Sequence, residues 1–94
     1  MTILIDPPLW PAHDTVWSHL VSDHSLEELH AFARAQGLPP QSFDRDHYDV
    51  PERRYEALVA AGAVPVSAGA LTRALIASGL RVTARERRTG PAEK

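Results

Sequence analysis

The chain has 94 residues, of which 44% are hydrophobic and 23% are charged, and these are ordinary values for a folded protein. A chain of this length forms one small domain that buries roughly 60–65% of its unfolded surface. It contains no cysteine, which excludes disulfides, thiolate metal ligands and a cysteine nucleophile. No apolar run approaches the ~20 residues of a membrane-spanning helix, and the N-terminus lacks the basic flank of a signal peptide. We therefore expect a cytoplasmic protein with no membrane partner.

Charge is unevenly distributed along the chain. Residues 1–71 carry ten acidic side chains and four arginines, whereas residues 72–94 carry six basic and two acidic side chains. A nucleic-acid-binding domain normally has a dominant basic face, but here the basic excess lies largely in a short run from Arg81 to Arg88. We expect a globular domain over residues 1–84, a flexible basic tail over residues 85–94, and no nucleic-acid partner.

The first half of the chain predicts two strands and a helix. The apolar run 2–5, stopped by prolines, is typical of a buried strand, and residues 16–21 form a second candidate strand in which Trp17, His19 and Val21 share one face. Residues 9–15 contain proline and aspartate and predict a loop. Ser25, followed three residues later by glutamate, predicts a helix that ends at Gly37.

The second half predicts two more helices and short strands. Residues 38–42 read as a linker and residues 43–50 as a polar, irregular segment. Pro51 suits the first turn of a helix capped by Asp49 or Val50, and Ser67 caps a third helix that ends at Gly79. Residues 63–66 predict a strand near a sheet edge, because they include a proline, and residues 80–83 a last strand. Together these elements predict an α/β or α+β domain, with a small mixed sheet of four to five short strands packed with three helices.

Histidine and aspartate are confined to one part of the chain. All five histidines and all six aspartates lie between Asp6 and Asp49. Imidazole and carboxylate are the ligands that zinc, manganese or iron(II) accept when thiolates are absent. In an extended segment His47 and Asp49 point to the same side, so both can reach one ion. The alternative is that Asp49 only caps a helix and His47 lies on a surface loop.

Three further residues are candidates because of where they lie. His19 sits in an otherwise apolar strand and His30 at the border of a helical apolar stripe, so each needs a hydrogen-bond partner or a ligand. Asp6 ends the first strand, where carboxylates line the ligand crevice of open sheets. Each also has a purely structural interpretation, as a hydrogen-bonded core or interface histidine or as a turn aspartate.

Several segments of the chain together resemble a known family. The segments ILIDPP, WSHLVSD, SLEELHAFA, DHYDV and the following AxxxGAVPVS are similar to the domain-of-unknown-function family numbered 4031, small proteins of bacteria and their phages. The resemblance covers about residues 2–80 and implies no particular reaction. It implies that the family pattern features Trp17 and the six polar or aromatic positions Asp6, His19, His30, His47, Tyr48 and Asp49.

These observations lead to two hypotheses. In the first, a polar pocket binds a divalent metal (zinc or manganese), through His19, His30, His47 and Asp49, or a small anionic ligand. This pocket hydrolyses a phosphoester-type bond, with Asp6 and Tyr48 as catalytic groups. It requires the side chains of His19 and His47 to lie within ~10 Å of each other. In the second, the protein is a non-enzymatic binding or regulatory module that acts through the Trp10 loop or the basic tail.

Overall fold

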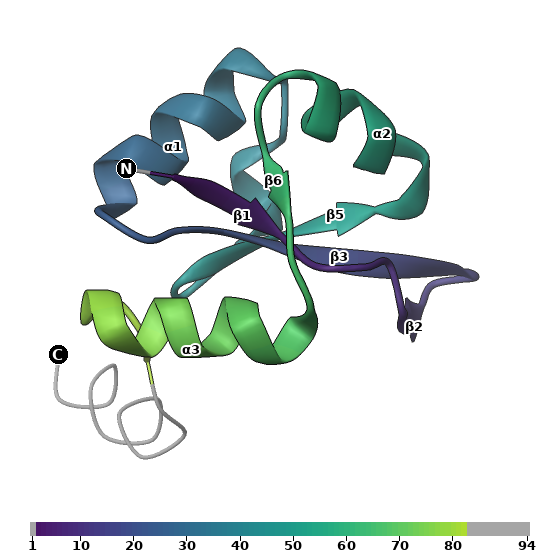
Figure 1. Ribbon diagram of the computed structural model, residues 1–94. Coiled ribbons are helices and arrows are strands. Elements are labelled where there is room, and N and C mark those ends of the chain that lie inside the picture. Colours follow the sequence, from purple (N-terminus) through teal and green to yellow (C-terminus); the bar gives the residue numbers. More distant parts are fainter. Residues whose placement is uncertain (1, 83–94) are drawn as a thin grey trace, which may run out of the picture.

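The computed structural model describes residues 2–82, which form a mixed sheet with helices on both faces (Figure 1). In chain order the elements are β1 (Ile3–Ile5), β2 (Trp10–Ala12), β3 (Thr15–Ser22), α1 (Leu26–Ala35), the 3-10 turn η1 (Pro40–Ser42), β4 (Phe43–Asp44), β5 (His47–Pro51), α2 (Glu52–Ala60), β6 (Val64–Pro65) and α3 (Ala68–Ser78). Three helices and a mixed sheet in one compact domain confirm the predicted α+β class. Within residues 2–82 the sheet has six strands, not the four to five expected.

The long strand β3 organises the sheet. The strand order is β4-β5-β3-β1-β6, and β2 pairs with the outer end of β3. All pairings are antiparallel except the one between β1 and β6, which is parallel. Strand β6 lies at the sheet edge, as its proline predicts. Because β3 pairs with β1, β2 and β5, its side chains lie between residues that are distant in sequence.

The two faces of the sheet are covered unequally. Of the three helices in the described part of the chain, α1 and α2 lie on one face and α3 lies on the other (Figure 1). The first face holds the larger apolar core, with Leu20, Val50 and Leu58 fully buried. The second core, under α3, consists of four buried residues, Leu4, Val21, Leu71 and Leu75. The α3 face is therefore the one with polar side chains left between sheet and helix.

The predicted helix ends are largely confirmed. The Ser25 hydroxyl accepts a hydrogen bond from the Glu28 amide at the start of α1, and Ser67 caps α3 in the same way. Gly79 ends α3 in the left-handed conformation at φ 83°, where a side chain would be strained. The Asp49 or Val50 cap of α2 is wrong, because Pro51 occupies the N-cap position with no side-chain hydrogen bond.

Two hairpins correct the sequence prediction. Residues 9–15, expected to be a loop, contain β2 and a two-residue turn in which His13 and Asp14 have φ of 50° and 65°. Residues 43–50, expected to be irregular, form the β4–β5 hairpin, with Arg45 at φ 64°. Turns of this kind are normally marked by glycine or asparagine, so the sequence carried no strong signal for either.

Of the C-terminal segment, the structure describes residues up to Val82. Residues 80–82 are not a strand, and Thr83 and the predicted tail over residues 85–94 lie outside the described residues. Within residues 2–82 no helix has the length and apolar character needed to cross a membrane. The cytoplasmic location stays a prediction.

Candidate metal centre

Strands β3 and β5 bring two histidines and an aspartate together on the α3 face. His19 on β3 is directly opposite Asp49 on β5, and His47 precedes Asp49 by two residues and so shares its face. The ring centroids of His19 and His47 are 4.9 Å apart, with the rings nearly perpendicular. The prediction that these two side chains approach each other is confirmed.

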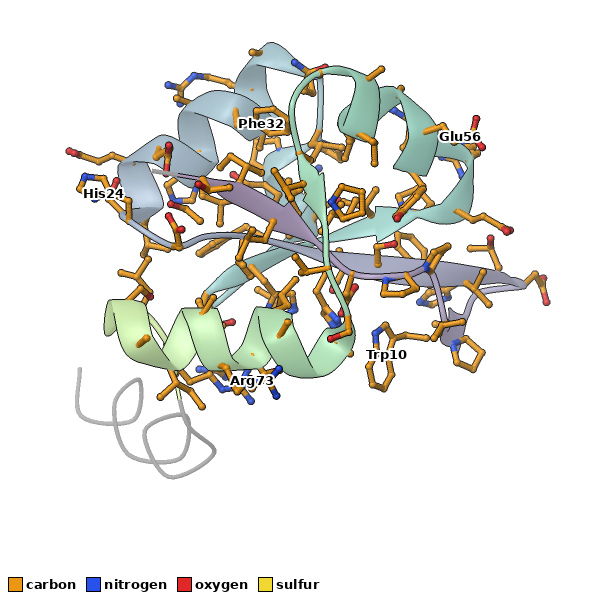
Figure 2. All side chains as sticks on the ribbon, in the orientation of Figure 1. Trp10, His24, Phe32, Glu56 and Arg73 are labelled. Carbon is orange, nitrogen blue, oxygen red and sulfur yellow. The ribbon has the colours of Figure 1, made fainter. Side chains whose placement is uncertain are left out.

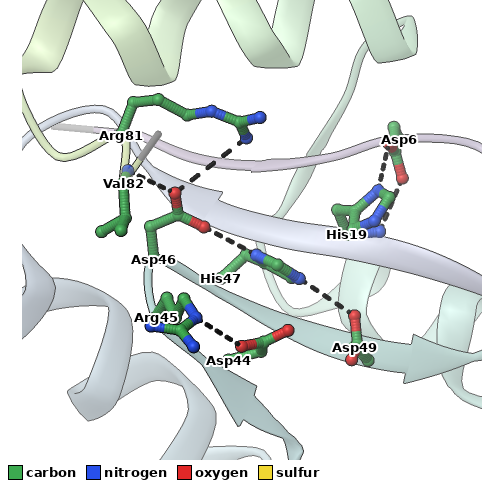
Figure 3. Close-up of polar contacts among 9 residues, drawn as sticks. All are labelled: Asp6, His19, Asp44, Arg45, Asp46, His47, Asp49, Arg81 and Val82. Carbon is green, nitrogen blue, oxygen red and sulfur yellow. Dashed lines mark hydrogen bonds and ion pairs between the residues drawn. The ribbon is translucent and has the colours of Figure 1, made fainter. Parts of the chain in front are cut away.

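Asp6 fixes the ring of His19. Its carboxylate, 1% exposed, accepts a hydrogen bond from the His19 amide at 2.6 Å through Oδ1 and lies 2.9 Å from the His19 Nδ1 through Oδ2 (Figure 3). Because Nδ1 is engaged, Nε2 is the ring nitrogen of His19 left for a ligand. Asp6 directly follows β1. Because β1 pairs with β3, Asp6 lies next to His19.

Asp46 fixes the ring of His47 in the same way. Its fully buried carboxylate lies 2.7 Å from the His47 Nδ1 through Oδ1 and accepts a hydrogen bond from the Val82 amide at 2.8 Å through Oδ2 (Figure 3). The Arg81 guanidinium is 4.0 Å from the same Oδ2. On the other side of the ring, Nε2 of His47 is 3.1 Å from Oδ1 of Asp49. Both imidazoles therefore have Nδ1 oriented by a carboxylate.

The carboxylates around His47 also set its protonation. Burial alone lowers the pKa of His47, but hydrogen bonds to Asp49 and Asp46, with the negative charges of both, outweigh burial and raise the pKa above the ordinary value of 6.5. The position next to Nε2 of His47 thus favours a positive charge.

The three side chains form a set that can hold one ion. One ligand atom from each of His19, His47 and Asp49 lies within 4.8 Å of the other two. They line a cavity of about 450 Å³ between the sheet and α3, which we call the metal cavity. Its wall also includes Asp6, Asp44 and Arg81. Three carboxylates and one guanidinium in the wall make the cavity net acidic before histidine protonation is considered, which suits a cation.

Comparison with known proteins places this chain in a family. The sequence model of the family described as "Protein of unknown function (DUF4031)" matches residues 3–78. The chain belongs to DUF4031. No curated protein and no solved structure gives a significant match. The DUF4031 match begins with β1 and ends with α3, and it includes the three ligand candidates and Asp6, whereas Arg81 and Val82 lie beyond it.

Two of the predicted residues lie elsewhere in the DUF4031 fold. Tyr48 is next to His47 in β5 and so points to the opposite face, where it is 5% exposed within the larger core. Its hydroxyl lies 2.7 Å from Nδ1 of His30 on α1, and the His30 ring packs against Phe43 at 4.7 Å between centroids. The structure therefore separates His30 and Tyr48 from the cluster and gives both a structural partner.

Sequence reasoning missed three residues of the site. Asp46 lies between acidic neighbours, and nothing in the sequence signals that it is fully buried. Trp10, expected as a partner-binding loop residue, lines the cavity with its ring 5.2 Å from that of His19. Arg81 was assigned to the start of a basic run, and only its position after α3 places it in the cavity wall.

Proposed function

We propose that this protein binds a divalent metal ion through His19, His47 and Asp49 and uses it to hydrolyse a phosphoester. The observation that carries the proposal is the pair of oriented imidazoles. Nδ1 of each ring is held by a carboxylate with almost no exposure, so that the Nε2 side of each ring is directed to one cavity, where Nε2 of His47 lies 3.1 Å from Asp49. Histidines that ligate metals have this second partner, because it fixes the tautomer and the ring direction.

The donor set fits zinc or manganese. Two neutral imidazoles and one carboxylate, with further positions open to the cavity, are a common set of ligands for catalytic divalent metals, and no thiolate is needed. Asp6 belongs to this arrangement as a positioning residue for His19, since both of its oxygens contact that residue. Asp46 has the same role for His47.

An anionic phosphoester is the substrate class that the cavity supports. The bound ion and the Arg81 guanidinium in the cavity wall together supply positive charge for phosphate oxygens. A divalent metal there supplies a Lewis acid that polarises a phosphoryl oxygen and activates water. In the hydrolysis, the water oxygen bonds to phosphorus and the P–O bond to the alcohol breaks. One proton of the water passes to the leaving alcohol oxygen, and the other stays on the phosphate product or passes to solvent.

The test is a metal titration followed by an activity assay. Protein stripped with a chelator should bind one Zn²⁺ or Mn²⁺ ion per chain by calorimetry. The variants His19→Ala, His47→Ala and Asp49→Ala should each weaken binding at least tenfold. The loaded protein should hydrolyse p-nitrophenyl phosphate or its diester, and a chelator should stop the reaction.

His24→Ala is the matched control. His24 is an exposed histidine that follows β3. It lies at the opposite end of the molecule from Trp10, which lines the cavity of the candidate metal site (Figure 2). Its variant should bind metal like the unmodified protein. Binding that is absent, or equal in His47→Ala and the unmodified protein, overturns the metal centre. Metal binding without turnover on either ester overturns the hydrolytic assignment.

A non-enzymatic docking module is the second candidate. The observation in its favour is the exposure of two neighbouring apolar side chains, Leu9 at 68% and Trp10 at 47%. Exposed tryptophan is a common anchor in protein interfaces. Trp10, however, also contacts His19 and lines the metal cavity, so we assign it to the small-molecule site. The predicted action of the basic tail concerns residues outside those described.

A further inference from the structure

A second cavity adjoins the metal centre. It has a volume of about 340 Å³ and lies on the same face of the sheet, beyond the region that α3 covers, with Trp10, His13 and Trp17 in its wall. Trp10 and Asp49 line both this cavity and the metal cavity. A ligand can therefore extend from one into the other past a tryptophan ring. Both volumes are in the range of small-molecule sites.

The wall of this cavity is aromatic and held in place. Trp10 and Trp17 are directly opposite in the β2–β3 pair, and the Trp17 indole nitrogen donates a hydrogen bond to the Ala12 carbonyl at 2.9 Å. His13 stands edge-on to Trp17 at 6.5 Å between centroids. Trp10 leans on His19 yet keeps 47% of its surface exposed, on the α3 side of the sheet (Figure 2). An exposed indole held beside a cavity is a stacking platform for a planar ring.

We infer that the substrate is a nucleoside phosphate, whose base stacks on Trp10 in the second cavity while its phosphate lies at the metal centre. The inference rests on the proposed function for the phosphate end and on the second cavity for the base. Gln41 and Ser42, from the turn η1, add an amide and a hydroxyl to the cavity wall. These groups can pair with the hydrogen-bonding edge of a heterocycle, which a plain phenyl ring lacks.

The acidic side chains in the wall of the metal cavity explain why the phosphate end of the ligand needs the bound ion. Asp49 lies at their junction and Asp44 lines the metal cavity, so a phosphate without a bound cation meets negative charge. The base therefore supplies affinity in the second cavity, and the ion admits the phosphate. The two cavities share Trp10 and Asp49 in their walls, so one mononucleotide can present its base to one and its phosphate to the other.

The experiment compares three ligands on the protein loaded with Mn²⁺. We expect adenosine 5′-monophosphate to bind at least about fivefold more tightly than ribose 5-phosphate, since stacking of one base on an aromatic side chain gives roughly this much or more. Phenyl phosphate should bind between the two. Stacking should also quench the tryptophan fluorescence with adenosine 5′-monophosphate and not with ribose 5-phosphate.

Variants of the exposed pair Leu9 and Trp10 provide the controls. Trp10→Ala should remove the preference for the nucleotide, Trp10→Phe should keep part of it, and Leu9→Ala, which alters a more exposed residue outside both cavity walls, should leave it unchanged. All three should still bind Mn²⁺. Equal binding of the nucleotide and ribose 5-phosphate, a preference that persists in Trp10→Ala, or phenyl phosphate binding as tightly as the nucleotide overturns the inference.

Failure of the metal centre is measured separately. In metal-free protein, adenosine should quench the tryptophan fluorescence and ribose should not, because the base cavity does not need the ion. Quenching by adenosine without any Mn²⁺ binding would contradict the proposed function while supporting the base site. Mn²⁺ binding without quenching by adenosine would contradict the base site alone.

Discussion

Histidine lies on both faces of the sheet, in two different settings. On the face covered by α1 and α2, His30 faces the Tyr48 hydroxyl at 2.7 Å and packs edge-on against aromatic rings of the core. On the face covered by α3, His19 and His47 each face a carboxylate with one nitrogen, and both line a cavity with Asp49. A histidine side chain thus packs into the core on the first face, whereas two histidine side chains converge with an aspartate on the second face.

The difference between the faces follows from how much of each is covered. Two helices lie over the first face, and its core closes around Leu20, Val50 and Leu58. One helix covers the second face, where the apolar cluster is limited to four buried residues. On the rest of that face, His19 and His47 are held by buried carboxylates and line a cavity. The comparison predicts that changes on the first face alter stability and changes on the second alter binding.

The largest expected effect is on the stability of the first face. Leu29 of α1 is fully buried in its core, so Leu29→Ala should lower the free energy of unfolding by about 2–5 kcal/mol, measured by urea denaturation. Ile76 on α3 is 59% exposed, and Ile76→Ala should change stability by less than about 0.5 kcal/mol. Equal losses in the two variants would contradict the burial of Leu29 in the core of the first face.

On the second face, a buried carboxylate should control metal affinity. Asp46→Asn keeps the shape of the side chain but removes the charge that orients His47, so it should weaken Zn²⁺ binding by about 10–100-fold in a calorimetric titration. Asp14→Asn, in the exposed turn before β3, is the matched control and should bind Zn²⁺ normally. Normal affinity in Asp46→Asn would mean that Asp46 does not position a ligand.

Removal of a hydroxyl on the first face should affect stability and spare the metal. Tyr48→Phe deletes the partner of His30 and should cost about 0.5–1.5 kcal/mol of unfolding free energy. The Zn²⁺ affinity of this variant should equal that of the unmodified protein, although Tyr48 directly follows His47. A weakened affinity would show that the two faces are coupled through β5.

The smallest expected effect is a pH dependence of the metal-free protein. Because the fold raises the pKa of His47, its protonated form stabilises the folded state at pH below 6.5, and this contribution is lost as the pH rises through the raised pKa. Thermal melts of the unmodified protein and His47→Gln should therefore differ most at about pH 5.5 and converge at alkaline pH. A difference that grows with pH would have the wrong sign.

Local signals in the sequence determined much of the fold. Ser25 and Ser67 mark the starts of α1 and α3 because a hydroxyl satisfies an unpaired amide in the first helical turn, and Gly79 ends α3 because it accepts a positive φ. The strands β1 and β3 follow from short apolar runs. Because His47 and Asp49 are two residues apart, the sequence also predicted that they share a face if the segment is extended.

Only the tertiary structure decided which residues meet. The register of β3 against β5 sets His19 opposite Asp49, and register depends on pairing between residues far apart in sequence, which no local pattern encodes. The hairpins that hold Trp10 and His47 turn at non-glycine residues of positive φ, so their turns gave no signal. Asp46 becomes buried because the chain after α3 returns to donate the Val82 amide to it. Burial and convergence are properties of the assembled sheet, and they separate His19 and His47 from the chemically identical His30.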